Sequence, residues 1–124
     1  MVPHFRKKGS AMDLNLVVLA GHIAAEPEVR TFPSGARLVR YLVTVRTTEP
    51  KRRVDVVPVS LWDPPDELVD DLDVRGKLAW VVGAVQRRFW SAEGDKRSRI
   101  EVIAHQVNIR EPEPAESDEE PSAA

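Results

Sequence analysis

The chain has 124 residues, of which 42% are hydrophobic, and a formal net charge of −2 at pH 7. This length is typical of one domain with a modest core. No apolar stretch approaches the roughly 20 residues that a membrane-spanning helix needs, and the opening residues MVPHFRKKGSAM lack the apolar run of a secretory signal. The absence of cysteine excludes disulfides and thiolate metal sites, so we expect a cytoplasmic protein without a membrane partner.

The two ends of the chain differ in composition from the middle. Residues 111–124, EPEPAESDEEPSAA, contain six acidic residues, no basic ones and no large apolar side chain. Such a segment buries too little apolar surface to offset the entropy lost on ordering, so a disordered acidic tail is predicted. Residues 1–12 are predicted to be a disordered extension or a cloning remnant, with Met12 as an alternative natural start. The folded domain is therefore expected over residues 13–110.

Three strands are predicted in the first half of this domain. The first is the apolar run LNLVVLAGHIA, residues 14–24, and FPSG after it is typical of a turn. The second, RLVRYLVTVRT at residues 37–47, alternates, with Tyr41 and three valines on one face. The third, RRVDVVPVSLW at residues 52–62, also alternates, and Pro58 within it indicates an edge or a bulge.

One helix and two further strands are predicted after these. The helix is DPPDELVDDLDVRG, with Asp63 as its N-cap and Gly76 as its end. The strand KLAWVVGAVQRRFW follows, and Gly83 within it indicates a bulge or bend. SAEGDKR is expected to form a hairpin that leads into the last strand, SRIEVIAHQVNI. This order predicts an all-β, five-stranded OB-fold, a Greek-key barrel with one short helix between strands three and four.

Aromatic and basic side chains are predicted to gather on the face of the sheet that is turned away from the core. Because side chains alternate along a strand, Trp62 is out of phase with the core valines of its strand, and Arg88 shares a face with Trp90. The segments PKRR and DKRSR place more cations at the strand ends. The candidate binding residues are Trp62, Trp90, Arg88, Arg40, Arg46, Arg52, Arg53, Arg87, Lys96 and Arg97.

This combination of side chains suits single-stranded nucleic acid, whose unpaired bases stack on aromatic rings and whose phosphates are neutralised by Lys and Arg. A protein interface is the alternative, because such interfaces are also rich in aromatics and Arg, and because Val54 and Val56 face outward. A small OB-fold enzyme would need clustered inward-facing carboxylates, whereas the acidic residues lie mainly on the helix and tail. Trp80 alternates with apolar neighbours and is expected in the core or in a subunit interface.

No cofactor or metal site is predicted. The three histidines do not have the spacing of metal ligands, and the acidic residues of DELVDDLD are expected on a solvated helix face.

Five segments in order resemble the bacterial single-stranded DNA-binding protein family: NLVVLAGHI, EPEVRTFPSG, VSLW, VRGKLAWVVGAV and RRFW. The resemblance covers about residues 13–110. It implies an OB-fold that binds single-stranded DNA without sequence preference, usually as a homotetramer, during replication, recombination or repair at the nucleoid. It also implies that Trp62 and Trp90 are stacking sites with phosphate-binding cations beside them. The apolar opening strand LNLVVL and Trp80 by themselves suit a dimer interface.

The chain departs from this family at two places. The family often carries Trp in the hairpin between the second and third strands and again at the start of the third, where this chain has TTEPKRRV and Val56. Fewer stacking residues predict weaker binding or a smaller site per subunit. The family's tail ends in an acidic-hydrophobic tip that docks replication and repair proteins, whereas this tail ends in EEPSAA. A protein-interaction module is therefore the alternative function.

Overall fold

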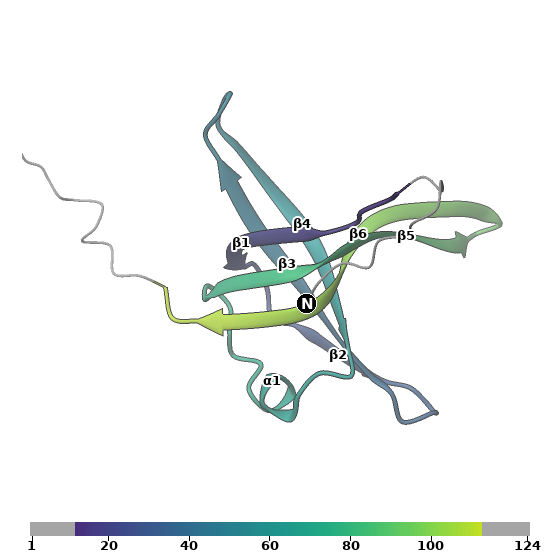
Figure 1. Ribbon diagram of the computed structural model, residues 1–124. Helices are drawn as coiled ribbons and strands as arrows, with labels where there is room; N and C mark the ends of the chain where they lie inside the picture. Colours follow the sequence, from purple (N-terminus) through teal and green to yellow (C-terminus); the bar gives the residue numbers. More distant parts are fainter. Residues whose placement is uncertain (1–11, 113–124) are drawn as a thin grey trace, which may run out of the picture.

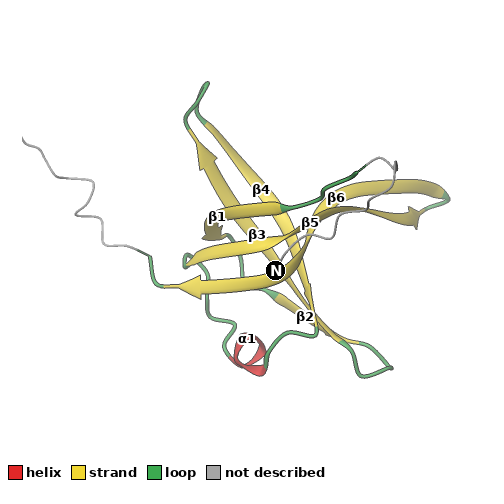
Figure 2. Cartoon of the chain, viewed as in Figure 1, coloured by secondary structure: helices red, strands yellow, loops and turns green. Residues whose placement is uncertain are grey.

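The computed structural model describes residues 12–112. Apart from Met12, Glu111 and Pro112, both predicted disordered ends lie outside these residues. The described part contains β1 (Val17–Ile23), β2 (Glu28–Thr31), β3 (Arg37–Thr47), β4 (Arg53–Trp62), α1 (Asp66–Asp70), β5 (Leu78–Ala92) and β6 (Asp95–Arg110). Strands dominate, as Figure 2 shows. Within this range no helix is long and apolar enough to cross a bilayer.

The six strands form one mixed sheet in the order β1-β5-β6-β4-β3-β2, and a further pairing of β1 with β3 joins the sheet into a ring. All pairings are antiparallel except that of β4 with β6. The mostly-β architecture with one short helix is confirmed, but the prediction of five strands is wrong. The additional strand, β2, has only four residues, which is too short for its alternation to stand out in the sequence.

The core lies inside the ring and matches the alternation predicted for β3 and β4. Val39, Tyr41 and Val43 of β3 are buried there, as are Val59 and Leu61 of β4. Buried residues of β1, β5 and β6 complete the cluster. Because successive side chains of a strand point to opposite faces, the intervening residues of β3 and β4 face outward.

Two long hairpins project from the body of the molecule (Figure 1). One is formed by β3 and β4, and the other by β5 and β6, whose strands have 15 and 16 residues. At the base of the second hairpin the register shifts between Val82 and Gly83, so the predicted bulge is confirmed. Val82 pairs with Gln106 and Gly83 with Ala104, which leaves His105 as the additional residue. A Cβ at Gly83 would collide with the Ile103 carbonyl, so glycine is needed for this close approach.

Pro58 and the helix show how proline shapes the chain. Pro58 pairs with Leu42 of β3, and the pairing of β4 with β6 begins only at Val59, so the proline occupies the expected edge position. The predicted helix limits are wrong, since α1 has five residues with Pro65 at its N-cap. Asp63 instead adopts a φ of 51°, and its N–H donates to the Arg37 carbonyl.

Gly76 also differs from its predicted role, because it lies six residues beyond the end of α1. Its φ is 86°, and its N–H donates to the Ile23 carbonyl, which ties the loop before β5 to the end of β1. Two prolines before the helix lack N–H donors and restrict the backbone, so a helix starting at Asp63 is not formed.

Candidate nucleic-acid interface

The side chains that point away from the core on β2, β3 and β4, on residues 84–92 of β5 and on residues 95–103 of β6 form one continuous surface, which we call the outer face. The strand register brings Ser60 beside Arg40, Gln86 beside Glu101, and Trp90 beside Arg97. Its main members are Arg30, Arg40, Leu42, Arg46, Val54, Val56, Pro58, Ser60, Trp62, Gln86, Arg88, Trp90, Arg97, Arg99 and Glu101.

A hollow of 280 Å³ lies in the middle of the outer face, and we call it the central groove. Trp62 lines it from the end of β4 and is 47% exposed. The ring of Phe32, from the turn after β2, lies 5.4 Å from the Trp62 ring between centroids, at 30°. Phe32 therefore supports one side of an indole that still offers surface to a ligand.

Three guanidinium groups line the same groove, those of Arg30, Arg40 and Arg88. None of them takes part in the ion pairs found among residues 12–112. The Nε of Arg40 is buried and has no hydrogen-bond partner there. The groove therefore combines an exposed aromatic ring with three arginines that form no ion pair within the described chain.

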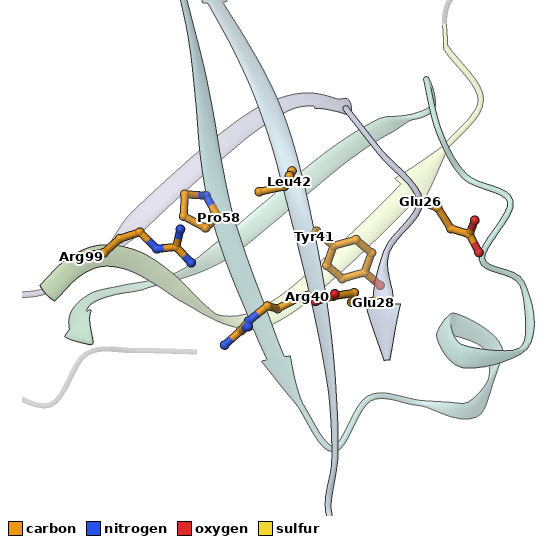
Figure 3. A pocket seen from close by; sticks show the side chains of 7 residues that line it. All are labelled: Glu26, Glu28, Arg40, Tyr41, Leu42, Pro58 and Arg99. Atoms are coloured by element: carbon orange, nitrogen blue, oxygen red, sulfur yellow. The ribbon is translucent and has the colours of Figure 1, made fainter. Parts of the chain in front are cut away.

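A second hollow of 340 Å³ adjoins the central groove through Arg40, which lines both. Figure 3 shows Arg40 and Arg99 approaching it from β3 and β6, whereas Tyr41 and Glu26 lie on the opposite side of β3 in this view. Leu42 and Pro58 supply apolar surface between the two arginines. Glu26 and Glu28 also line this hollow, so the surface that continues from the central groove toward the β3–β4 hairpin carries both charges beside its apolar part.

Trp90 lies on the outer face of the β5–β6 hairpin. It is 39% exposed and stands opposite Arg97. The guanidinium carbon of Arg99 is 5.8 Å from the centroid of its ring, which is within the range of a cation–π contact. The structure thus places an aromatic ring and two cations together on this hairpin.

The predicted binding residues are distributed over two faces and a hairpin tip. Trp62, Arg40 and Arg88 meet in the central groove, and Trp90 and Arg97 lie on the same face. By contrast, Arg87 and Lys96 alternate onto the opposite face of the β5–β6 hairpin, where the Arg87 guanidinium donates to the Ser98 hydroxyl at 2.9 Å.

The β3–β4 hairpin holds the other three predicted cations. Arg46 shares the outer face, and together with Arg52 and Arg53 it lines a hollow of 300 Å³ at the tip. Arg53 is paired with Asp55 at 3.0 Å, and this contact lowers the pKa of the Asp55 carboxyl. Both groups are well exposed, so the pair adds little stability.

Sequence reasoning missed Arg30, Phe32 and Arg99 as residues of this site. Phe32 belongs to the segment TFPSG, which was interpreted only as a turn. Arg99 is in phase with Arg97 along β6, so alternation would have identified it. Trp80 is 47% exposed and lines a separate hollow with Val82, Gln106 and Asn108, so the core alternative is wrong and its place in a subunit interface stays a prediction.

These observations define a small β-ring protein with an aromatic and cationic outer face. The model of the single-strand binding protein family matches residues 14–110. The chain belongs to this family, whose members are non-enzymatic DNA-binding proteins.

Individual relatives agree with this assignment. The chain is 30% identical over 104 residues to single-stranded DNA-binding protein 2 of Listeria innocua, with 80% of this chain and 65% of that protein covered. It is 31% identical to the protein of the same name from Listeria monocytogenes, with the same coverage. The chain thus spans slightly less than two thirds of the length of these relatives.

A solved structure shares the fold. It is titled "Plasmodium falciparum SSB complex with ssDNA" and matches with a TM-score of 0.65 at 16% identity. The match covers 81% of this chain and 96% of that chain.

Proposed function

We propose that this protein binds single-stranded DNA on its outer face without strong sequence preference, and so protects exposed strands during replication, recombination or repair. We also assign its ring of strands to the OB-fold and propose that it acts in the cytoplasm, at the nucleoid. The observation that carries the proposal is the central groove, where Trp62 is supported by Phe32 beside Arg30, Arg40 and Arg88. Membership of the single-strand binding protein family supports the same partner, single-stranded DNA.

The proposed path of the strand follows the outer face. One base stacks on Trp62 and another on Trp90, since stacking does not depend on the identity of the base. Arg40 and Arg88 neutralise phosphates between them, with Arg97 on the hairpin. The missed residues Arg30 and Arg99 lie on the same path.

The other predicted cations receive more limited roles. Arg46 and Arg52, at the tip of the β3–β4 hairpin, contact phosphates of a longer strand. Arg53, Arg87 and Lys96 are not aligned with the path and contribute through long-range attraction, which salt screens. Val54 and Val56 extend the outer face where the family often has aromatics, so the affinity of each subunit is expected to be lower.

A homo-oligomer, with a tetramer favoured over a dimer, is also proposed. From Val17 to Gly21, β1 pairs only with β5, so its other edge is open among the described residues. Leu14, Leu16 and Val18 are more than half exposed beside this edge, and Trp80 lies next to them through its pairing with Ala20. Open apolar edges are suited to pairing with another copy. Recruitment of replication and repair proteins by the tail remains a prediction, because residues 113–124 lie outside the described part.

A protein-interaction module is the second candidate function. The exposed Val54 and Val56, together with Phe89 at 70% exposure on the back of the β5–β6 hairpin, favour it. In that case the aromatic residues would contact a protein partner instead of bases. The two candidates differ in whether salt-sensitive binding of a bare oligonucleotide occurs.

Titration with oligo-dT at low and high salt tests the proposal, with tryptophan fluorescence as the signal. The variant Trp80→Phe removes the tryptophan that lies away from the outer face, so the remaining signal comes from Trp62 and Trp90. Strong quenching that weakens as salt rises is the expected result, because stacking quenches the indole and phosphate contacts release counterions. A folded protein without quenching or binding at low salt would contradict the proposal and favour the interaction module.

A further inference from the structure

A buried carboxylate lies in the floor of the central groove, where a phosphate-binding surface would gain nothing from a negative group. Glu101 is 6% exposed and Ser60 is 2% exposed, and both line the groove. The Ser60 hydroxyl donates to Oε1 of Glu101 at 3.2 Å. None of the ion pairs among residues 12–112 includes Glu101. Burial of a carboxylate is costly, so its position needs a reason.

The chemistry of the bases supplies a reason. Cytosine, adenine and guanine each carry an exocyclic amino group that donates hydrogen bonds, and a carboxylate is a suitable acceptor for cytosine N4. Thymine instead carries the carbonyl O4 at that position, which a carboxylate repels. A base that stacks on Trp62 has its edge in the same groove as Glu101.

We infer that Glu101 is a specificity-determining residue, which makes the central groove favour bases with an amino group over thymine. Ser60 occupies Oε1 and orients the carboxylate, so Oε2 is left as the acceptor for the base. The inference rests on the proposed function, because it assumes that a base enters the groove. It adds a modest base preference to a surface whose other contacts are independent of sequence.

The test compares oligo-dC with oligo-dT of equal length, for the wild-type protein and for Glu101→Gln, at mildly alkaline pH. Stacking and chain flexibility also differ between the two oligonucleotides, so the informative quantity is the change in the ratio of their dissociation constants. The glutamine amide donates to thymine O4 and lacks the negative charge. We expect the preference for dC relative to dT to fall by about five- to tenfold in the variant. An unchanged ratio would overturn the inference.

Glu28→Gln is the matched control, because Glu28 is an exposed carboxylate of the same face that does not line the central groove. It should raise the affinity for both oligonucleotides equally and leave the ratio unchanged. Ser60→Ala should give an intermediate ratio, since it removes only the orienting hydrogen bond. A ratio that changed as much in Glu28→Gln would show a general charge effect and contradict the role of Glu101.

A measurement on the wild-type protein covers the case in which Glu101→Gln does not fold. Oligonucleotides of 2-pyrimidinone lack only the 4-amino group of cytosine, so they should bind more weakly than oligo-dC. Equal binding would refute the inference while leaving the proposed function intact. If neither oligo-dC nor oligo-dT bound in a salt-sensitive manner, the proposed function itself would fail, and the inference with it.

Discussion

Trp62 and Trp90 lie on the same face of the molecule but in different surroundings. Trp62 is at the end of β4, where Phe32 packs against its ring and the closed part of the sheet lies beneath. Trp90 is on a two-stranded hairpin, where its aromatic ring is within cation–π distance of Arg99. A rigidly supported ring loses little freedom when a base stacks on it, whereas a ring on a projecting hairpin must be ordered during binding. We therefore expect Trp62 to be the stronger stacking site.

Replacing Trp62 with alanine should have the largest effect on DNA binding. The loss of affinity for oligo-dT is expected to be about 2–3 kcal/mol, the upper part of the range for one stacked base. Fluorescence titration measures it, and Trp80→Phe, which keeps an aromatic ring beside the proposed subunit interface, is the control for loss of an exposed tryptophan elsewhere. Unchanged affinity with intact folding by circular dichroism would show that the central groove is not the stacking site.

The Trp90→Ala variant should bind more weakly than the wild type by about 1 kcal/mol, the lower part of the same range. Its fold should be intact, because the side chain belongs to the hairpin and not to the core cluster. Thermal melting checks the fold, and titration checks the affinity. A larger loss than that of Trp62→Ala would reverse the proposed order of the two sites.

The variant Phe32→Ala tests whether the packing of Phe32 against the Trp62 ring contributes to DNA binding. Phe32→Ala should reduce affinity by less than about 1 kcal/mol, and this loss should disappear when Trp62 is already alanine. The double-mutant cycle on oligo-dT gives this coupling. Additive losses would instead mean that Phe32 contacts DNA independently of Trp62.

Arg88 and Arg87 are neighbours in sequence on opposite faces of β5, so they form a matched pair. Arg88→Gln should reduce the dependence of log K on log salt concentration by about 0.7, the value for one phosphate contact on a single strand. Arg87→Gln should leave this slope nearly unchanged, because its side chain is turned to Ser98. Equal changes in slope for the two variants would contradict the distinction between the faces.

A substitution of Tyr41 tests the burial of β3 side chains in the core, and we expect it to have the smallest effect of these variants. Burial raises its pKa from 10.0 to about 12, so the folded state retains a proton that the unfolded state loses. The contribution of this hydroxyl to the free energy of unfolding is fully present below pH 10, and it is lost as the pH rises toward about 12.

Tyr41→Phe should remove this component of alkaline destabilisation. It should cost no more than about 1 kcal/mol at neutral pH, because the buried hydroxyl has no hydrogen-bond partner among the described residues. Denaturation at several pH values measures both effects. The chain has only one tyrosine, so its ultraviolet absorbance reports the titration directly. An absorbance midpoint near pH 10 would contradict the burial of this group.

The alternation of apolar residues was sufficient to predict which residues of β3 and β4 are inside and that Trp62 faces outward. The alternation did not reveal β2, because its four residues form a strand only by pairing with β3. The helix was predicted too long because Asp63 and Gly76 have typical terminal residue types, whereas backbone hydrogen bonds to β3 and β1 determine their positions.

The candidate site was predicted in part. Arg87 was included because it is adjacent to the aromatic residues, and Arg53 and Lys96 because PKRR and DKRSR lie at strand ends. The phase of all three along the strands places them on the other face. Phe32 could not be found by sequence reasoning of this kind, because its contact with Trp62 joins two segments 30 positions apart. The role proposed for Glu101 depends on a hydrogen bond with Ser60 that connects β4 and β6, which no local sequence pattern contains.

The additional residue in β6 has a consequence for how this strand tolerates change. Before His105, Val102 and Ala104 face the core, and after it Val107 and Ile109 do. The inward-facing residues of β6 therefore have even numbers before His105 and odd numbers after it. Loss of His105 alone would leave Gly83 opposite Ala104 and Val82 opposite Gln106, so Val107 and Ile109 would still face the core. Loss of one residue from the regular ladder of β6 would instead turn polar residues inward and apolar ones outward, whereas paired changes at the hairpin tip would preserve the phase. Length variation among functional variants of this chain should therefore collect at the tip and at the bulge, and be excluded from the regular ladder of β6.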